Sequence, residues 1–179
     1  MSSESGRGRE MQFVTLGIDR EVFGVPVSAV LEILEMRPMF RLPEAPPYLA
    51  GLIDVRGRGV PAIDLRVKLG LPPVVATENT RILVLEVMIG ERPVVLGLIA
   101  DRVIEVISLV MDDIEPTPEI GLRWRSDYIS GIGRRNDGFV IIFNLPSLFS
   151  REEAMLIDQS GASRSEAPVT STTMGQTAA

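Results

Sequence analysis

The chain has no cysteine and no histidine among its 179 residues. Without cysteine it can form no disulfide, bind no metal through thiolates and use no thiol nucleophile. Without histidine it lacks the most common general base, the most common transition-metal ligand and any phospho-accepting histidine. We therefore predict no catalytic residues, no metal site and no cofactor.

Nucleotide and calcium motifs are missing as well. The sequence contains no GxxxxGK[ST] loop, no GxGxxG fingerprint and no GxSxG elbow. A carboxylate site for a hard cation stays possible, but the DxDxDG-type spacing is absent. Asp112, Asp113 and Glu115 precede a proline-containing loop without ligand spacing, so we interpret them as solvated carboxylates. An enzyme is therefore a distant alternative.

Positive charge comes almost entirely from arginine, because Lys68 is the only lysine among 18 basic residues. Arginine is enriched in protein interfaces, although a compositional bias explains the same excess. The net charge of −6 argues against broad contact with nucleic acid or anionic lipid. The apolar runs are too short to span a bilayer, and residues 1–10 are too polar for a secretory signal. We expect a soluble cytoplasmic protein.

Two blocks of sequence occur twice, in the same order. Residues 23–34 resemble residues 96–107, with glycine, valine and glutamate at matching places. Residues 48–52 likewise resemble residues 128–132. The chain therefore looks like two copies of one structural unit, and function is sought where the copies differ.

Short apolar segments separated by glycine turns predict β-strands. The predicted strands cover residues 12–18, 21–27, 49–55, 60–65, 81–89, 93–100, 128–134 and 139–143. Many short strands with little helix indicate an all-β protein of barrels or sandwiches. Each copy of roughly 70 residues is marginal as a lone core. We expect the two units to pack together, and terminal segments crossing between them remain an alternative.

We predict one folded domain between two irregular ends. The boundaries are 1–11 for a flexible N-terminus, 12–158 for the domain, about 12–75 for barrel one, about 81–145 for barrel two, about 147–158 for a C-terminal helix and 159–179 for a disordered tail. Ser150 and Glu153 form a capping-box pattern at the start of that helix.

The hairpins and the strand before them are the candidate functional regions. The first hairpin turns through Arg56-Gly57-Arg58-Gly59, and the second turns through Arg135-Asn136-Asp137-Gly138. A hairpin arginine can contact a partner's carboxylate or backbone carbonyls, although a solvated turn arginine is the simpler interpretation. Glu32 lies between apolar neighbours. It is either a solubilising edge carboxylate or part of a docking strand with Val30.

Several motifs combine into one specific pattern. In the first half these are Val30-x-Glu32-Ile33, Pro43-x-x-Pro46, Tyr48-x-x-Gly51-Leu52-Ile53, Arg56-Gly57 and Pro61-x-Ile63-Asp64-Leu65. In the second half they are Gly97-Leu98-Ile99, Asp101-Arg102-Val103-x-Glu105-Val106, Pro116-x-Pro118 and Tyr128-Ile129-x-Gly131. This pattern, from residue 12 to about residue 158, resembles the CheW family of chemotaxis coupling proteins.

The resemblance implies two intertwined five-stranded SH3-like β-barrels with short helices. It implies a non-catalytic adaptor that couples chemoreceptor cytoplasmic tips to the regulatory domain of the histidine kinase CheA, peripheral to membrane-anchored receptor arrays and without inserting into the membrane. The alternative is a CheW-like scaffold of a non-motility chemosensory pathway that controls pili or a second messenger.

The resemblance also assigns roles to individual residues. It implies receptor binding by Arg56, Gly57 and Val30, and kinase binding by Glu32, Ile33 and Gly51. The family hairpin is Asn-Leu-Arg-Gly-like, whereas this chain has Asp54 at its first position. The two hairpins differ most at Arg56-Gly57, where copy two has Asn136-Asp137, so we predict that receptor specificity lies there.

Overall fold

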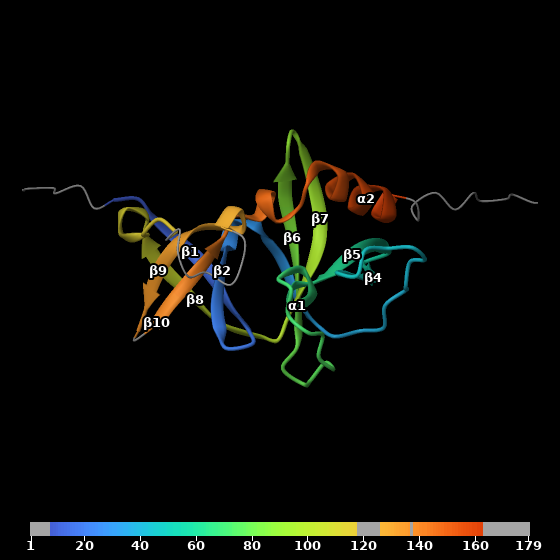
Figure 1. Cartoon of the computed structure of the whole chain (residues 1–179), viewed down its shortest axis with the longest axis horizontal. Helices are drawn as coiled ribbons and strands as arrows, with labels where there is room; N and C mark the ends of the chain where they lie inside the picture. Colours follow the sequence, from blue (N-terminus) through green and yellow to red (C-terminus); the bar gives the residue numbers. More distant parts are fainter. Residues whose placement is uncertain (1–7, 118–125, 137, 163–179) are drawn as a thin grey trace, which may run out of the picture.

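β-Strands are the main regular structure of the molecule. A computed structural model of the chain describes residues 8–117, 126–136 and 138–162 (Figure 1). The strands of the first half are β1 (Glu10–Ile18), β2 (Glu21–Pro26), β3 (Val30–Glu35), β4 (Leu49–Val55) and β5 (Arg58–Asp64). Those of the second half are β6 (Arg81–Ile89), β7 (Arg92–Ala100), β8 (Arg102–Val110), β9 (Ile129–Arg135) and β10 (Gly138–Phe143). The all-β prediction is confirmed. All eight predicted strands agree within two residues at each end, whereas β3 and β8 were not among them.

These strands form two five-stranded sheets that exchange strands between the halves of the chain. The first sheet has the order β8-β1-β2-β10-β9, and the second has the order β3-β6-β7-β5-β4. If each of β1–β5 is exchanged with its counterpart among β6–β10, the order of the first sheet becomes the order of the second. The duplication seen in the sequence is therefore a structural duplication, and the intertwining implied by the family resemblance is present.

The strand exchange contradicts the predicted barrel boundaries of about 12–75 and about 81–145. The β1–β2 hairpin pairs with β8 and β10 of the second half, and the β6–β7 hairpin pairs with β3 and β5 of the first half. The physical reason lies in the connections. Three residues separate β2 from β3, and Asp101 alone separates β7 from β8. Neither connection forms a hairpin turn, and each carries the chain directly from one sheet into the other.

The largest hydrophobic cluster contains residues of both sheets. It includes Val14, Leu16 and Phe23 of the first sheet together with Leu83 and Leu96 of the second, and all five side chains are buried. Phe23 and Phe143 stack with ring centroids 4.6 Å apart. Smaller clusters lie within each sheet, around Ile53 and Val84 in the second and Phe13 and Val140 in the first. Because the main core is shared, neither half has a complete core of its own.

In each half of the chain, the segment after the third strand (β3 or β8) closes the curved sheet that contains this strand. Phe40 and Leu52 exchange two backbone hydrogen bonds of 2.8 Å, which join the chain after β3 to β4. Glu115 and Ile132 do the same after β8, at 2.8 and 2.9 Å. Gly51 directly precedes Leu52, and Gly131 directly precedes Ile132. A Cβ atom at Gly51 would lie 2.5 Å from the carbonyl oxygen of Phe40, so only glycine permits this approach.

Helices are short and lie at the ends of strands. They are α1 (Leu65–Lys68), α2 (Arg151–Ala162) and the 3-10 turns η1 (Val27–Ala29), η2 (Met111–Asp113), η3 (Ser126–Tyr128) and η4 (Leu145–Leu148). The predicted capping box of α2 is confirmed. Glu153 N–H donates to Ser150 Oγ at 3.1 Å, and Ser150 N–H donates to Glu153 Oε2 at 2.7 Å.

The predicted ends of the domain need correction. β1 begins at Glu10 rather than after residue 11, because Glu10 and Met11 pair with β8. The predicted helix at about 147–158 is two elements, η4 and the longer α2, so residues 159–162 are helical rather than disordered. Residues 163–179 and Trp124 lie outside the described residues. Among the described residues, no helix is both long enough and apolar enough to cross a membrane.

Candidate functional site: the β3 edge and the Arg56 hairpin

The strand β3 forms one edge of the second sheet and turns apolar side chains outward. The side chains of Leu31 and Ile33 are 57% and 43% exposed. Glu32, between them, is half-buried, as is Val30, which packs against the shared core. The interpretation of Glu32 as an outward solubilising carboxylate is therefore wrong, because its apolar neighbours occupy the outer face of this edge.

The first hairpin turns tightly through two residues. Arg56 and Gly57 both have positive φ, at 53° and 81°, as hairpins with a two-residue type I′ turn require. Arg58 and Gly59, which were predicted to be part of the turn, belong to β5. The Gly57 N–H donates to Asp54 Oδ1 at 2.8 Å. Asp54 therefore holds the turn through a side-chain oxygen that asparagine also possesses, which explains how the departure from the family pattern is accommodated.

Arg56 and Glu32, to which the family resemblance gives different binding partners, contact each other. Nη2 of Arg56 lies 3.8 Å from Oε1 of Glu32, with side chains 84% and 30% exposed. Glu32 is on β3 and Arg56 follows β4, and these two strands are the opposite edges of the second sheet. The ion pair thus spans the seam of the curved sheet. Such an exposed pair contributes only about 0–1 kcal/mol to stability, so the Arg56 guanidinium can exchange partners easily.

A groove opens beside this ion pair. Its volume is about 640 Å³, and it is lined by Glu35, Met36, Arg37, Pro38, Asp54, Arg56 and Gly57. Nη1 of Arg37 donates to the backbone oxygen of Asp54 at 3.0 Å, which ties the end of β3 to β4. The sequence interpretation did not identify Arg37. No motif in the sequence singled it out.

The remaining predicted site residue, Gly51, is buried. It lies on β4 with φ of 152°, against the carbonyl oxygen of Phe40. Gly51 therefore allows the segment around Phe40 to pack closely against β4, and it has no side chain to offer a partner. Five of the six predicted residues lie on β3 or at the hairpin turn, and Gly51 lies behind them.

The second copy contains a related ion pair with a different exposure. Nε of Arg135 donates to Oε1 of Glu105 at 2.5 Å, and Glu105 is the counterpart of Glu32. Arg135, however, ends strand β9 and its side chain is 23% exposed, against 84% for Arg56. The groove beside it has a volume of about 510 Å³ and includes Asp112, Asp113, Glu115 and Arg134. The copies therefore share a scaffold, and an arginine extends into solvent at the turn of the first hairpin only.

A second polar cluster anchors α2 to the barrels. Lys68 Nζ donates to Glu153 Oε1 at 2.9 Å and lies 4.3 Å from the centre of the Tyr48 ring. Burial, helped by the neighbouring Glu153, raises the pKa of Tyr48 above its ordinary value. Burial alone would raise the pKa of Glu153, but hydrogen bonds from the Ser150 N–H, Lys68 and Tyr48 outweigh it, so this pKa is lowered.

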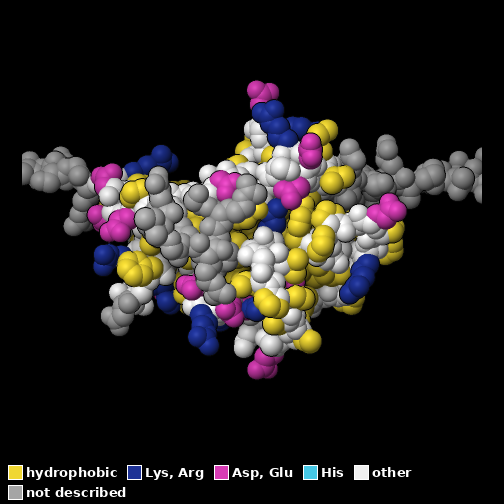
Figure 2. All heavy atoms as spheres, in the orientation of Figure 1, with side chains coloured by type: hydrophobic (Ala, Val, Ile, Leu, Met, Phe, Trp, Pro, Cys, Tyr) yellow, Lys and Arg dark blue, Asp and Glu magenta, His cyan; other side chains and the backbone are white. Residues whose placement is uncertain are grey.

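A further surface region is mainly apolar. In the view of Figure 2, hydrophobic side chains gather over α1, β4 and β5. An apolar groove of about 510 Å³ in this region includes Leu42, Pro46, Pro47, Leu49 and Val67. Within the described part of the chain, no group of three or more acidic side chains is placed to hold a metal ion.

Comparison with known proteins places most of the folded part of the chain beside one family. The family model described as "CheW-like domain" matches residues 12–153. The "Chemotaxis protein CheW" of Klebsiella aerogenes is 34% identical over 151 residues, which cover 84% of this chain and 87% of that protein. The protein of the same name from Helicobacter pylori is 30% identical, covering 84% and 88%.

A solved structure is similar as well. The crystal structure of the scaffolding protein TtCheW from Thermoanaerobacter tengcongensis superimposes with a TM-score of 0.74 and 27% sequence identity. The match covers 88% of this chain and 99% of that one. The residues matched by the family model, 12–153, include the β3 edge and the Arg56 hairpin.

Proposed function

The chain belongs to the CheW family of chemotaxis adaptors, and from this premise we propose that it couples chemoreceptor cytoplasmic tips to the regulatory domain of the histidine kinase CheA. The adaptor would act without catalysis, at the cytoplasmic side of a membrane-anchored receptor array. The observation that carries this proposal is the pairing of the exposed Arg56 with Glu32 beside the apolar edge of β3.

Receptor binding would use the hairpin. Arg56 is mostly exposed, and its 3.8 Å ion pair with Glu32 is weak enough for a carboxylate or carbonyl group of a receptor helix to replace it. Arginine offers several planar donors for such an exchange. Gly57 and Asp54 hold the turn in one conformation, so little conformational entropy is lost when the receptor binds.

Kinase binding would use the outer face of β3. Ile33 and its neighbour Leu31 present apolar surface on an edge strand, the kind of surface that protein partners cover. Glu32 belongs to this strand and to the ion pair at once. A receptor that draws Arg56 away would change the charge environment of Glu32, which gives a physical route from one partner to the other.

The test is reconstitution with purified partners from the same organism. We expect the full chain to bind a receptor cytoplasmic fragment and the kinase separately, and to raise kinase activity when all three are mixed. Binding to neither partner would refute the proposal.

A deletion strain distinguishes the two pathways that the resemblance allows. Loss of chemotaxis on swarm plates that is restored by the intact gene supports the motility assignment. Normal swarming with altered pili or second-messenger levels would instead support the non-motility scaffold.

A further inference from the structure

The two places where the chain crosses between the sheets are built differently. The first crossing runs through η1, from Val27 to Ala29, between β2 and β3. The second consists of Asp101 alone, between β7 of the second sheet and β8 of the first. The Asp101 N–H donates to the Gly17 carbonyl of β1 at 3.1 Å, so this single residue is already fixed to the first sheet.

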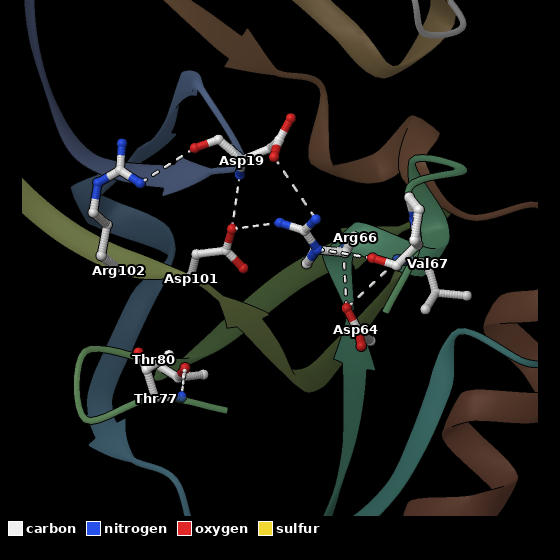
Figure 3. A network of polar contacts seen from close by, with 9 residues as sticks. Asp19, Asp64, Arg66, Val67, Thr77, Thr80, Asp101 and Arg102 are labelled. Atoms are coloured by element: carbon white, nitrogen blue, oxygen red, sulfur yellow. Dashed lines mark hydrogen bonds and ion pairs between the residues drawn. The ribbon is translucent and has the colours of Figure 1, made fainter. Parts of the chain in front are cut away.

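A nearly buried arginine converges on the second crossing. Nη1 of Arg66 lies 2.7 Å from Oδ2 of Asp101, and Nη2 lies 3.8 Å from Oδ1 of Asp19 (Figure 3). The Arg66 side chain is 11% exposed. The same Asp101 oxygen accepts the Asp19 N–H at 2.7 Å. Arg66, Asp101 and Asp19 therefore form a closed triangle of polar contacts.

Each corner of this triangle belongs to a different part of the fold. Arg66 lies in α1, directly after β5 of the second sheet, and Asp64 Oδ1 accepts its N–H at 3.0 Å. Asp19 lies in the β1–β2 turn of the first sheet. Nε of Arg66 donates to the Pro72 carbonyl at 2.9 Å, which adds the segment that links the two copies. One guanidinium thus joins both sheets, the crossing and the linking segment.

The other crossing cannot form this arrangement. In the register of the repeat, Ser28 replaces Asp101 and Pro146 replaces Arg66. Neither of these two side chains carries a charge. The shared hydrophobic core holds the sheets together but is non-directional, whereas the fork of an arginine fixes both distance and orientation.

We propose that Arg66 is a positioning residue that clamps the two sheets in one relative orientation at the Asp101 crossing. The clamp is formed by Arg66, Asp101 and Asp19. Its functional consequence rests on the adaptor role proposed above. The residues of this chain that are predicted to bind the receptor and the kinase all lie on the second sheet. The clamp sets how the first sheet is placed relative to partners bound there. Binding to either partner alone does not need the clamp, whereas kinase activation in the full assembly does.

The orientation can be measured directly in the free protein. Because the chain has no cysteine, the double variant Glu86→Cys/Ser108→Cys places one spin label on exposed β6 and one on exposed β8. With Arg66 intact we expect one narrow distance distribution in pulsed electron resonance. Arg66→Met should abolish the narrow distribution, and Arg66→Lys, which keeps a charge but loses the fork, should broaden it partly.

Arg20→Met is the matched control, because Arg20 is an exposed arginine on the same β1–β2 turn. It should leave the distribution unchanged. The clamp is refuted if Arg66→Met gives the same distribution as Arg20→Met. If Arg66→Met does not fold, Arg66→Lys decides, and an unchanged distribution in that variant refutes the clamp.

A second measurement tests the consequence. We expect Arg66→Lys to bind the receptor fragment and the kinase with unchanged affinity but to lose kinase activation in the three-component mixture. Full activation despite a broadened distribution would refute the functional role. Failure of the unsubstituted chain to bind its partners would instead refute the adaptor proposal, and the distances in the free protein would still decide the clamp.

Discussion

Arg56 and Glu32 face each other across the seam of the second sheet, with Nη2 and Oε1 3.8 Å apart. The family pattern assigns the first to receptor binding and the second to kinase binding. Their contact means that a change of charge at either residue alters the electrostatic environment of both surfaces. Single substitutions here therefore need a charge-swapped partner as control.

Arg56→Glu should weaken receptor binding without unfolding the protein. Loss of charge-assisted hydrogen bonds removes about 1.5–3 kcal/mol of binding free energy, a factor of ten or more in affinity. Stability should change by no more than about 1 kcal/mol, because the side chain is mostly exposed. Titration calorimetry with a receptor fragment and urea denaturation measure the two quantities.

The double variant Arg56→Glu/Glu32→Arg restores an ion pair of reversed polarity. We expect it to leave receptor binding weak, because the receptor requires the positive charge at the turn. Recovery of receptor affinity in the double variant would show that the pair, and not Arg56 itself, matters.

Ile33→Lys should reduce affinity for the kinase selectively. Ile33 is 43% exposed on the outer face of β3, so a lysine is tolerated there in the free protein but places a charge in an apolar interface. Val106→Lys is the matched control, because Val106 is the counterpart on β8 and is 56% exposed. Surface plasmon resonance with the kinase regulatory domain should detect a loss for Ile33→Lys only; equal losses would argue against a β3-specific surface.

Two glycines near the site should respond differently to alanine. Gly51→Ala places a Cβ atom 2.5 Å from the Phe40 oxygen and should cost about 2–4 kcal/mol by forcing the closing segment away. Gly57→Ala meets no atom within 4 Å and pays only for its positive φ, about 1–2 kcal/mol. Urea denaturation gives both values. Equal costs would contradict the close approach at Gly51.

Acid should weaken the attachment of α2 through Glu153. Its pKa is lowered in the folded protein, so its contribution is complete above the ordinary value of 4.5 and is lost as pH falls through the lower folded value. Asp64 acts in the opposite direction, since burial raises its pKa against the hydrogen bonds from Val67 and Arg66.

Glu153→Gln should therefore lose about 1–2 kcal/mol of stability at neutral pH and much less at pH values well below 4. Chemical denaturation at the two pH values measures this difference. The neighbouring exposed Glu152→Gln is the control and should change little at either pH. An equal loss at both pH values would show that Glu153 acts by packing rather than by charge.

The sequence predicted local features well and long-range ones poorly. Eight of the ten described strands, the β1–β2 turn and the capping box of α2 depend on residues close in sequence, whose alternation and polarity identify them directly. The contact of Arg56 with Glu32 joins two edges of a sheet and follows only from the curvature of that sheet. The polar triangle around Arg66 joins four segments. Helix α1 was missed because its four residues are too few to show helical periodicity, although Asp64 caps it.

The exchange of strands also sets an order of assembly during translation. The five strands of the second sheet all lie between Val30 and Ala100, so this sheet can form as soon as that stretch has left the ribosome. The β1–β2 hairpin is made first but must wait for β8, β9 and β10, the last of which ends at Phe143. During that interval the hairpin has neither β8 nor β10 to pair with. Its strand edges stay unpaired, which makes the oldest part of the nascent chain the part most in need of a chaperone.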